Sequence, residues 1–142
     1  MAAEGGGVYA GAREEQAQAL RRYAYNMGLA FQIADDVLDY SGTDEELGKP
    51  AGSDLANGVI TLPALYYLQG LPADAPERHI VEEGGDTSRV VQAIRASDAS
   101  ARAMAYAAEL VERAVRELAI FPDSPDRAAL IALAQSAIRR RR

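Results

Sequence analysis

Three closely spaced aspartates give the first indication of chemistry in this sequence. Asp35, Asp36 and Asp39 fall within little more than one turn of a predicted helix. Because residues three or four positions apart share a helix face, their carboxylates would lie close together and repel one another. The flanking residues are largely apolar, so these charges would also lose part of their hydration. A bound cation would reduce both costs.

The donor atoms indicate which cation that would be. All three side chains offer carboxylate oxygens, no histidine lies nearby, and the chain contains no cysteine. Oxygen ligands suit Mg²⁺ before Ca²⁺ and argue against zinc. Protein-bound Mg²⁺ usually keeps several waters and is shared with a substrate phosphate. We therefore predict a Mg²⁺ site at Asp35, Asp36 and Asp39 with a phosphate-bearing ligand; the alternative is an exposed acidic patch.

The segment after the aspartates has features typical of a phosphate-binding loop. Lys49 is the only lysine of the chain, and it lies between Gly48 and Gly52. A lone lysine among arginines suggests a selected point charge, and flanking glycines allow the backbone to approach an anion. Asp54 then places another carboxylate in the same segment.

Helices must position these residues, because the composition and the periodicity favour an all-α fold. Hydrophobic residues make up 49% of the 142 residues, with two Phe, no Trp and many alanines, which predicts closely packed helices in a single domain. Residues 1–7 predict a disordered start. Gly28, inside the first long helix, predicts a close approach of another helix. The expected helices span about 13–40, 61–69, 77–82, 87–95, 98–118 and 124–138.

Charge and hydropathy exclude some functions. The formal net charge of −6 argues against a nucleic-acid partner, because binding to a phosphodiester backbone needs a basic face. No segment approaches the roughly 18 apolar residues of a membrane span, and the first residues do not resemble a signal peptide. These features predict a cytoplasmic protein.

The spaced motifs together resemble a known family. The run GLAFQIADDVLDY, followed by GKPAGSD and TLP, is similar to the second aspartate-rich region of the trans-type polyprenyl diphosphate synthases. Several elements in the same order make this resemblance more specific than a lone DDxxD motif. The resemblance covers nearly the entire chain, but it corresponds only to the C-terminal half of a typical family member. It therefore implies a helical bundle that forms the C-terminal half of the isoprenoid synthase fold.

The resemblance also implies roles for individual residues. The substrates would be an allylic diphosphate and isopentenyl diphosphate, with Mg²⁺ held by the three aspartates. Gln32 and Lys49 would be catalytic: Gln32 would face the reacting prenyl chain and Lys49 would bind the departing diphosphate. Asp54 would order the metal-bound waters or the loop. The alternatives are that Gln32 bonds a neighbouring helix, and that Lys49 and Asp54 form a surface ion pair worth under about 1 kcal/mol.

Part of the family pattern is missing from these 142 residues. They contain no second acidic triad with this spacing and no counterpart of the family's first DDxxD motif. We therefore expect a partial or complementing half with little activity alone. The alternatives are a non-catalytic or regulatory subunit of a heteromeric synthase, and a truncated helical protein that forms a homodimer or larger homo-oligomer. A class I terpene cyclase is disfavoured by the GKPAGSD segment.

Overall fold

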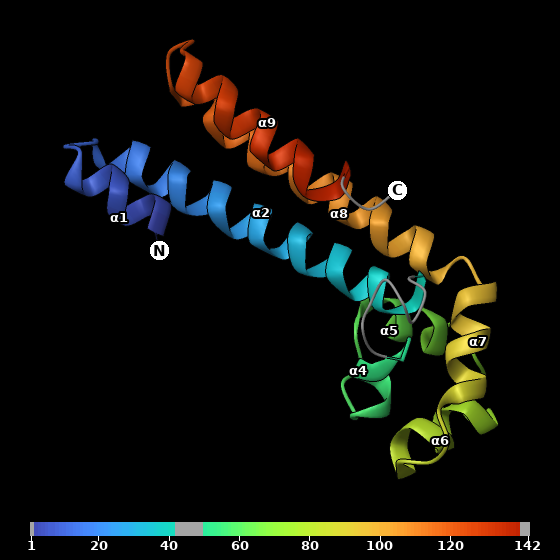
Figure 1. The fold of residues 1–142 in the computed structure, drawn as a ribbon. Helices are drawn as coiled ribbons and strands as arrows, with labels where there is room; N and C mark the ends of the chain where they lie inside the picture. The colour runs from blue at the N-terminus through green and yellow to red at the C-terminus, as the bar shows by residue number, and fades with distance from the viewer. Residues whose placement is uncertain (1, 42–49, 140–142) are drawn as a thin grey trace. The chain divides into compact units, whose positions relative to one another are not determined.

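All regular secondary structure in the computed structural model, which describes residues 2–41 and 50–139, is helical (Figure 1). This confirms the predicted all-α class. None of the described helices is both long and apolar enough to cross a membrane. The helices are α1 (Ala2–Tyr9), α2 (Glu14–Ser41), α4 (Ser53–Ala56), α5 (Leu62–Gln69), α6 (Pro76–Glu83), α7 (Ser88–Ala96), α8 (Ala99–Glu117), which continues into a 3₁₀ turn (Leu118–Ile120), and α9 (Pro125–Arg139).

Residue contacts divide the chain into two compact units. The first unit runs to Gln32 and resumes at Tyr106, whereas the second unit is Ile33–Ala105. The boundaries fall inside α2 and α8, so each of these helices contributes residues to both units. The single domain expected for residues 1–142 stays a prediction.

The first unit is held by α2, α8 and α9. The Tyr23 hydroxyl donates a hydrogen bond of 2.8 Å to the Leu130 carbonyl, and Arg22 pairs with Glu117 at 2.7 Å. The α8 and α9 residues buried here are mostly small, which allows helices to approach closely. The fully buried ones are Ala107, Ala114 and Ala134, and Leu118 of the 3₁₀ turn is fully buried beside them.

The second unit has an apolar core beneath the end of α2. Tyr67, Ile80 and Val81 pack against the edge of this core. Arg78 of α6 donates hydrogen bonds to the carbonyls of Leu68, Leu71 and Pro72, at and just after the end of α5. The last carbonyls of a helix lack N–H partners within it, so such side-chain donors stabilise its end. The buried core residues are Tyr40, Leu55, Ala64, Val90, Val91 and Ile94.

The structure corrects two expectations about glycine-containing segments. Residues 2–7 belong to α1 instead of forming the disordered start expected, and Gly7 is buried where an added Cβ would lie 2.7 Å from Leu20 Cδ1. At Gly28 the described residues show no such close approach, because nothing apart from the adjacent backbone of α2 lies within 4 Å of an added Cβ.

Candidate functional site

The residues predicted to hold metal all lie on α2. Asp35 and Asp36 are half-buried, whereas Asp39 is only 3% exposed. Gln32 is exposed on the same helix, at the end of the first unit. The helix therefore brings the three aspartates into one short stretch, as their spacing requires, but it gives them different environments.

Asp39 is held by the beginning of α4. Ser53 Oγ donates a hydrogen bond of 3.0 Å to one carboxylate oxygen, and the Asp54 N–H donates one of 3.2 Å to the other. The Asp39 carbonyl accepts a third bond, of 2.8 Å, from the Gly52 N–H. Because the first N–H groups of a helix lack partners within it, a carboxylate at this position is favourable. Asp39 thus connects the end of α2 to the start of α4.

The donor set fits a hard cation only in part. Asp35 and Asp36 offer carboxylate oxygens, which suit Mg²⁺. Both oxygens of Asp39 already accept hydrogen bonds. Within residues 2–41 and 50–139, no three carboxylate, histidine or cysteine side chains are grouped as a metal site. The assignment of Mg²⁺ to Asp35, Asp36 and Asp39 stays a prediction.

The two predicted loop residues have different outcomes. Lys49 lies outside the described residues. Asp54 is half-buried in α4, where its carbonyl accepts a hydrogen bond of 2.9 Å from the Val59 N–H and helps the chain turn towards α5. One-turn helix α4 itself was not expected from the sequence.

Tyr40 is a buried residue of this region for which the sequence predicts no role. Its side chain is fully buried, its hydroxyl accepts a hydrogen bond of 3.4 Å from Thr61 Oγ1, and its carbonyl accepts one from Arg95 Nε. Thr61 occupies the N-cap position of α5, as expected, but its side chain does not cap that helix. The end of α2 is therefore tied to α5 and α7. The sequence feature that could have indicated this role is the position of Tyr40, an aromatic residue, directly after the acidic motif.

Burial is the main cause that raises the pKa of the Tyr40 phenol above its ordinary value of 10.0. The hydrogen bond from Thr61 lowers this pKa, but less than burial raises it. Three carboxylates raise it further: those of Asp39, Asp54 and Asp36.

Replacing Tyr40 with Phe should make the protein less sensitive to alkaline pH. The folded state favours the neutral phenol, so Tyr40 contributes stability below pH 10.0 that is lost as pH rises towards the raised pKa. We expect Tyr40 to lower the free energy of unfolding above pH 10.0 by up to about 1.4 kcal/mol per pH unit. The Tyr40→Phe variant should lack this contribution and therefore lose less stability as the pH rises. Urea titrations between pH 8 and about 11 measure the difference. Equal slopes in both proteins would contradict the prediction.

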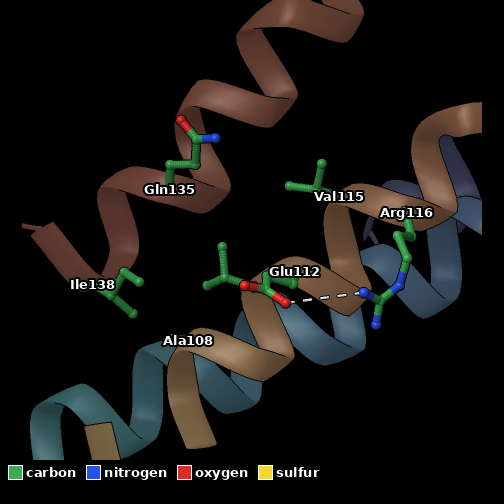
Figure 2. Close-up of a pocket in the computed structure, with 7 residues that line it drawn as sticks. Ala108, Glu112, Val115, Arg116, Gln135 and Ile138 are labelled. Carbon is green, nitrogen blue, oxygen red and sulfur yellow. Dashed lines mark ion pairs between the residues drawn. The ribbon is translucent and has the colours of Figure 1, made fainter. Parts of the chain in front are cut away.

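A pocket lies in the first unit. Glu112 and Arg116 of α8 form an ion pair at 4.0 Å at this pocket (Figure 2). Gln135 and Ile138 line it from α9. Ala108, Val111 and Val115 complete its mostly apolar lining. Of the predicted site residues that the structure describes, none lines this pocket.

Solved structures define the class of protein to which this helical fold belongs. A polyprenyl synthase from Caulobacter crescentus CB15, complexed with calcium and isoprenyl diphosphate, has a TM-score of 0.85 and 39% identity over 98% of this chain and 44% of that chain. A geranylgeranyl pyrophosphate synthase from Bacteroides thetaiotaomicron has a TM-score of 0.84 and 30% identity, over 96% and 47% of the two chains. The fold is therefore that of part of a prenyl diphosphate synthase, since it matches 44% and 47% of these two chains.

Sequence comparisons then give the family. The family model described as Polyprenyl synthetase matches residues 1–114. Nonaprenyl diphosphate synthase of Mycobacterium tuberculosis is 37% identical over 95% of this chain and 42% of its own length, and octaprenyl diphosphate synthase of Escherichia coli is 37% identical over 99% and 45%. Heptaprenyl diphosphate synthase component 2 of Geobacillus stearothermophilus is 38% identical over 91% and 41%.

The chain belongs to the polyprenyl synthetase family, which confirms the resemblance found in its aspartate-rich segment. It spans less than half of the length of these curated relatives.

Proposed function

We propose that this chain provides a metal-binding and diphosphate-binding part of a trans-prenyltransferase, which joins an allylic diphosphate to isopentenyl diphosphate. The observation that carries this proposal is the half-buried pair Asp35 and Asp36 on α2 of a chain in the polyprenyl synthetase family. The similar synthase from Caulobacter crescentus, which is complexed with calcium and isoprenyl diphosphate, supports a divalent cation and a prenyl diphosphate as ligands.

Four of the predicted residues have a role in this proposal. Asp35 and Asp36 hold Mg²⁺ through carboxylate oxygens, the ligands that a hard cation prefers. When bound, Mg²⁺ supplies positive charge that stabilises the diphosphate as its bond to the allylic carbon breaks. Gln32, exposed on the same helix, faces the prenyl chain. Lys49 binds the diphosphate as a point charge, a role that rests on the sequence alone.

We further propose that turnover requires residues beyond these 142. The first aspartate-rich motif of the family is absent from them, and the relatives are more than twice as long. Two relatives are named as component 2 of heptaprenyl diphosphate synthases, which supports a complementing partner. A regulatory subunit, a homodimer and a cytoplasmic location stay predictions.

The site is tested by its effect on thermal unfolding. With ~5 mM Mg²⁺ and methylene bisphosphonate at about 100 times its Kd, binding should add roughly 2.7 kcal/mol to the free energy of unfolding and raise Tm by several degrees. Mg²⁺ alone should have a smaller effect. The rise should disappear in the variant Asp35→Asn with Asp36→Asn.

The matched control is Asp74→Asn, which removes an exposed carboxylate of the second unit outside the predicted site. This variant should keep the full rise in Tm. If the wild-type chain shows no rise, the proposed diphosphate site is absent from it.

A further inference from the structure

The three aspartates of the acidic motif differ in what surrounds them. Asp35 and Asp36 are half-buried, whereas Asp39 is 3% exposed and both of its carboxylate oxygens accept hydrogen bonds from the start of α4. A buried carboxylate is stable only when its oxygens are hydrogen-bonded or paired. The bonds from Ser53 and Asp54 fulfil this condition without a cation.

Coordination of a metal by Asp39 would disturb this arrangement. Its carboxylate would have to share or give up its bonds to the Ser53 hydroxyl and the Asp54 N–H. Those donors would then lose an acceptor in a partly buried place, where an unpaired polar group is unfavourable. The adjacent backbone is also fixed, because the Asp39 carbonyl accepts from Gly52 and Tyr40 is fully buried.

We propose that Asp39 is a positioning residue and not a metal ligand. Its carboxylate anchors the start of α4 to the end of α2, and this places Asp54 beside the acidic motif. The metal-binding part of the motif is then reduced to Asp35 and Asp36, a consequence that rests on the proposed function. The anchoring role itself rests only on the contacts described above.

Replacing Asp39 with Asn separates the two roles. An asparagine can accept the Asp54 N–H through its amide oxygen and donate to Ser53 Oγ through its amide nitrogen, because a hydroxyl both donates and accepts. The anchor is therefore kept while the negative charge that a metal ligand supplies is lost. Asp35→Asn is the matched variant, since it removes the same charge one turn earlier on α2.

The first measurement is the affinity of the 142-residue chain for Mn²⁺, a spectroscopic substitute for Mg²⁺, in the presence of methylene bisphosphonate. We expect Asp39→Asn to bind Mn²⁺ within about twofold of wild type and Asp35→Asn to bind it at least about tenfold more weakly, because affinity depends on the charge of the direct ligands. Equal weakening in both variants would show that Asp39 is a ligand and overturn the proposal.

The second measurement is hydrogen exchange at the Asp54 amide, followed by NMR. Asp39→Ala should speed exchange there by about tenfold, because the N–H loses its acceptor, and Asp39→Asn should leave it close to wild type. If Asp39→Ala does not fold, Ser53→Ala replaces it in this experiment. Ser53→Ala removes one donor to Asp39 and should speed exchange at the Asp54 amide by a smaller factor.

The two measurements distinguish the anchor from the metal site. If the wild-type chain binds no Mn²⁺, the proposed function fails, and the exchange rates alone decide the role of Asp39. If exchange at Asp54 is unchanged in both Asp39→Ala and Ser53→Ala, Asp39 is not an anchor.

Discussion

Replacing Gly52 with alanine is expected to lower the free energy of unfolding by roughly 2–5 kcal/mol. Gly52 has a φ of +74°, which is unfavourable for a residue with a side chain. An added Cβ would also lie 2.3 Å from Val91 Cγ2 and 2.9 Å from Val91 Cγ1. Val91 is buried in the core of the second unit, and its branched side chain has little freedom to move away. Urea unfolding monitored by circular dichroism measures the loss.

Gly58 provides a matched control for the backbone part of this effect. Its φ is +78°, but an added Cβ would meet nothing within 4 Å among the described residues beyond its chain neighbours. Gly58→Ala should therefore cost only about 1–2 kcal/mol. In a background with Val91→Ala, the additional cost of Gly52→Ala should fall close to that level, because both Cγ contacts are removed and only the approach of 3.2 Å to Val91 Cβ remains. Equal losses in the free energy of unfolding for Gly52→Ala and Gly58→Ala, both in the wild-type background, would contradict crowding by Val91.

Replacing Asp35 with Asn is expected to lower prenyl transfer about 10²–10³-fold in a reconstituted synthase, because the charge that holds the cation beside the leaving diphosphate is lost. Reconstitution would combine this chain with the part of the Escherichia coli octaprenyl diphosphate synthase that this chain does not match. Incorporation of radiolabelled isopentenyl diphosphate into longer products measures the rate.

Two controls accompany this measurement. The 142-residue chain alone should give no product above background, and Asp74→Asn in the combined protein should behave as wild type. Turnover by the chain alone would refute the proposal of a complementing half, and an Asp35→Asn variant as active as its parent would refute the metal-binding role proposed for Asp35.

Much of the helical structure follows from local sequence patterns. The long helix ending near Tyr40, the helix after Thr61, and the last helix after Ser124 all begin and end close to where periodicity and Pro or Gly residues predict. The last helix is also capped by its own sequence, since Ser124 Oγ accepts a hydrogen bond of 3.1 Å from the Arg127 N–H. These elements are predictable because neighbouring residues determine them.

Two helices escape prediction because residues distant in the sequence support them. The glycine-rich α1 has low intrinsic helix propensity, and Gly7 within it packs against Leu20 of α2. The single turn of α4 begins where Ser53 and Asp54 meet Asp39, 14 and 15 residues earlier. A local pattern contains neither contact.

The candidate site shows the same limit. Spacing alone places Asp35, Asp36 and Asp39 close together on one helix and treats them as equivalent ligands. It does not reveal that Asp39 is nearly inaccessible, or that Thr61 donates to Tyr40 instead of capping its own helix. Family resemblance predicts the chemistry of such a site, whereas burial in the folded chain distinguishes its carboxylates from one another.

The division of the chain also determines the order in which its parts can fold. In the first unit, Tyr23 bonds to Leu130 across 107 residues and Arg22 pairs with Glu117 across 95, so closing this unit costs more chain entropy than forming local contacts. The second unit is one uninterrupted segment, Ile33–Ala105. During synthesis on a ribosome, all residues of the second unit are therefore available once Ala105 has emerged, whereas the contacts that close the first unit must wait for Leu130.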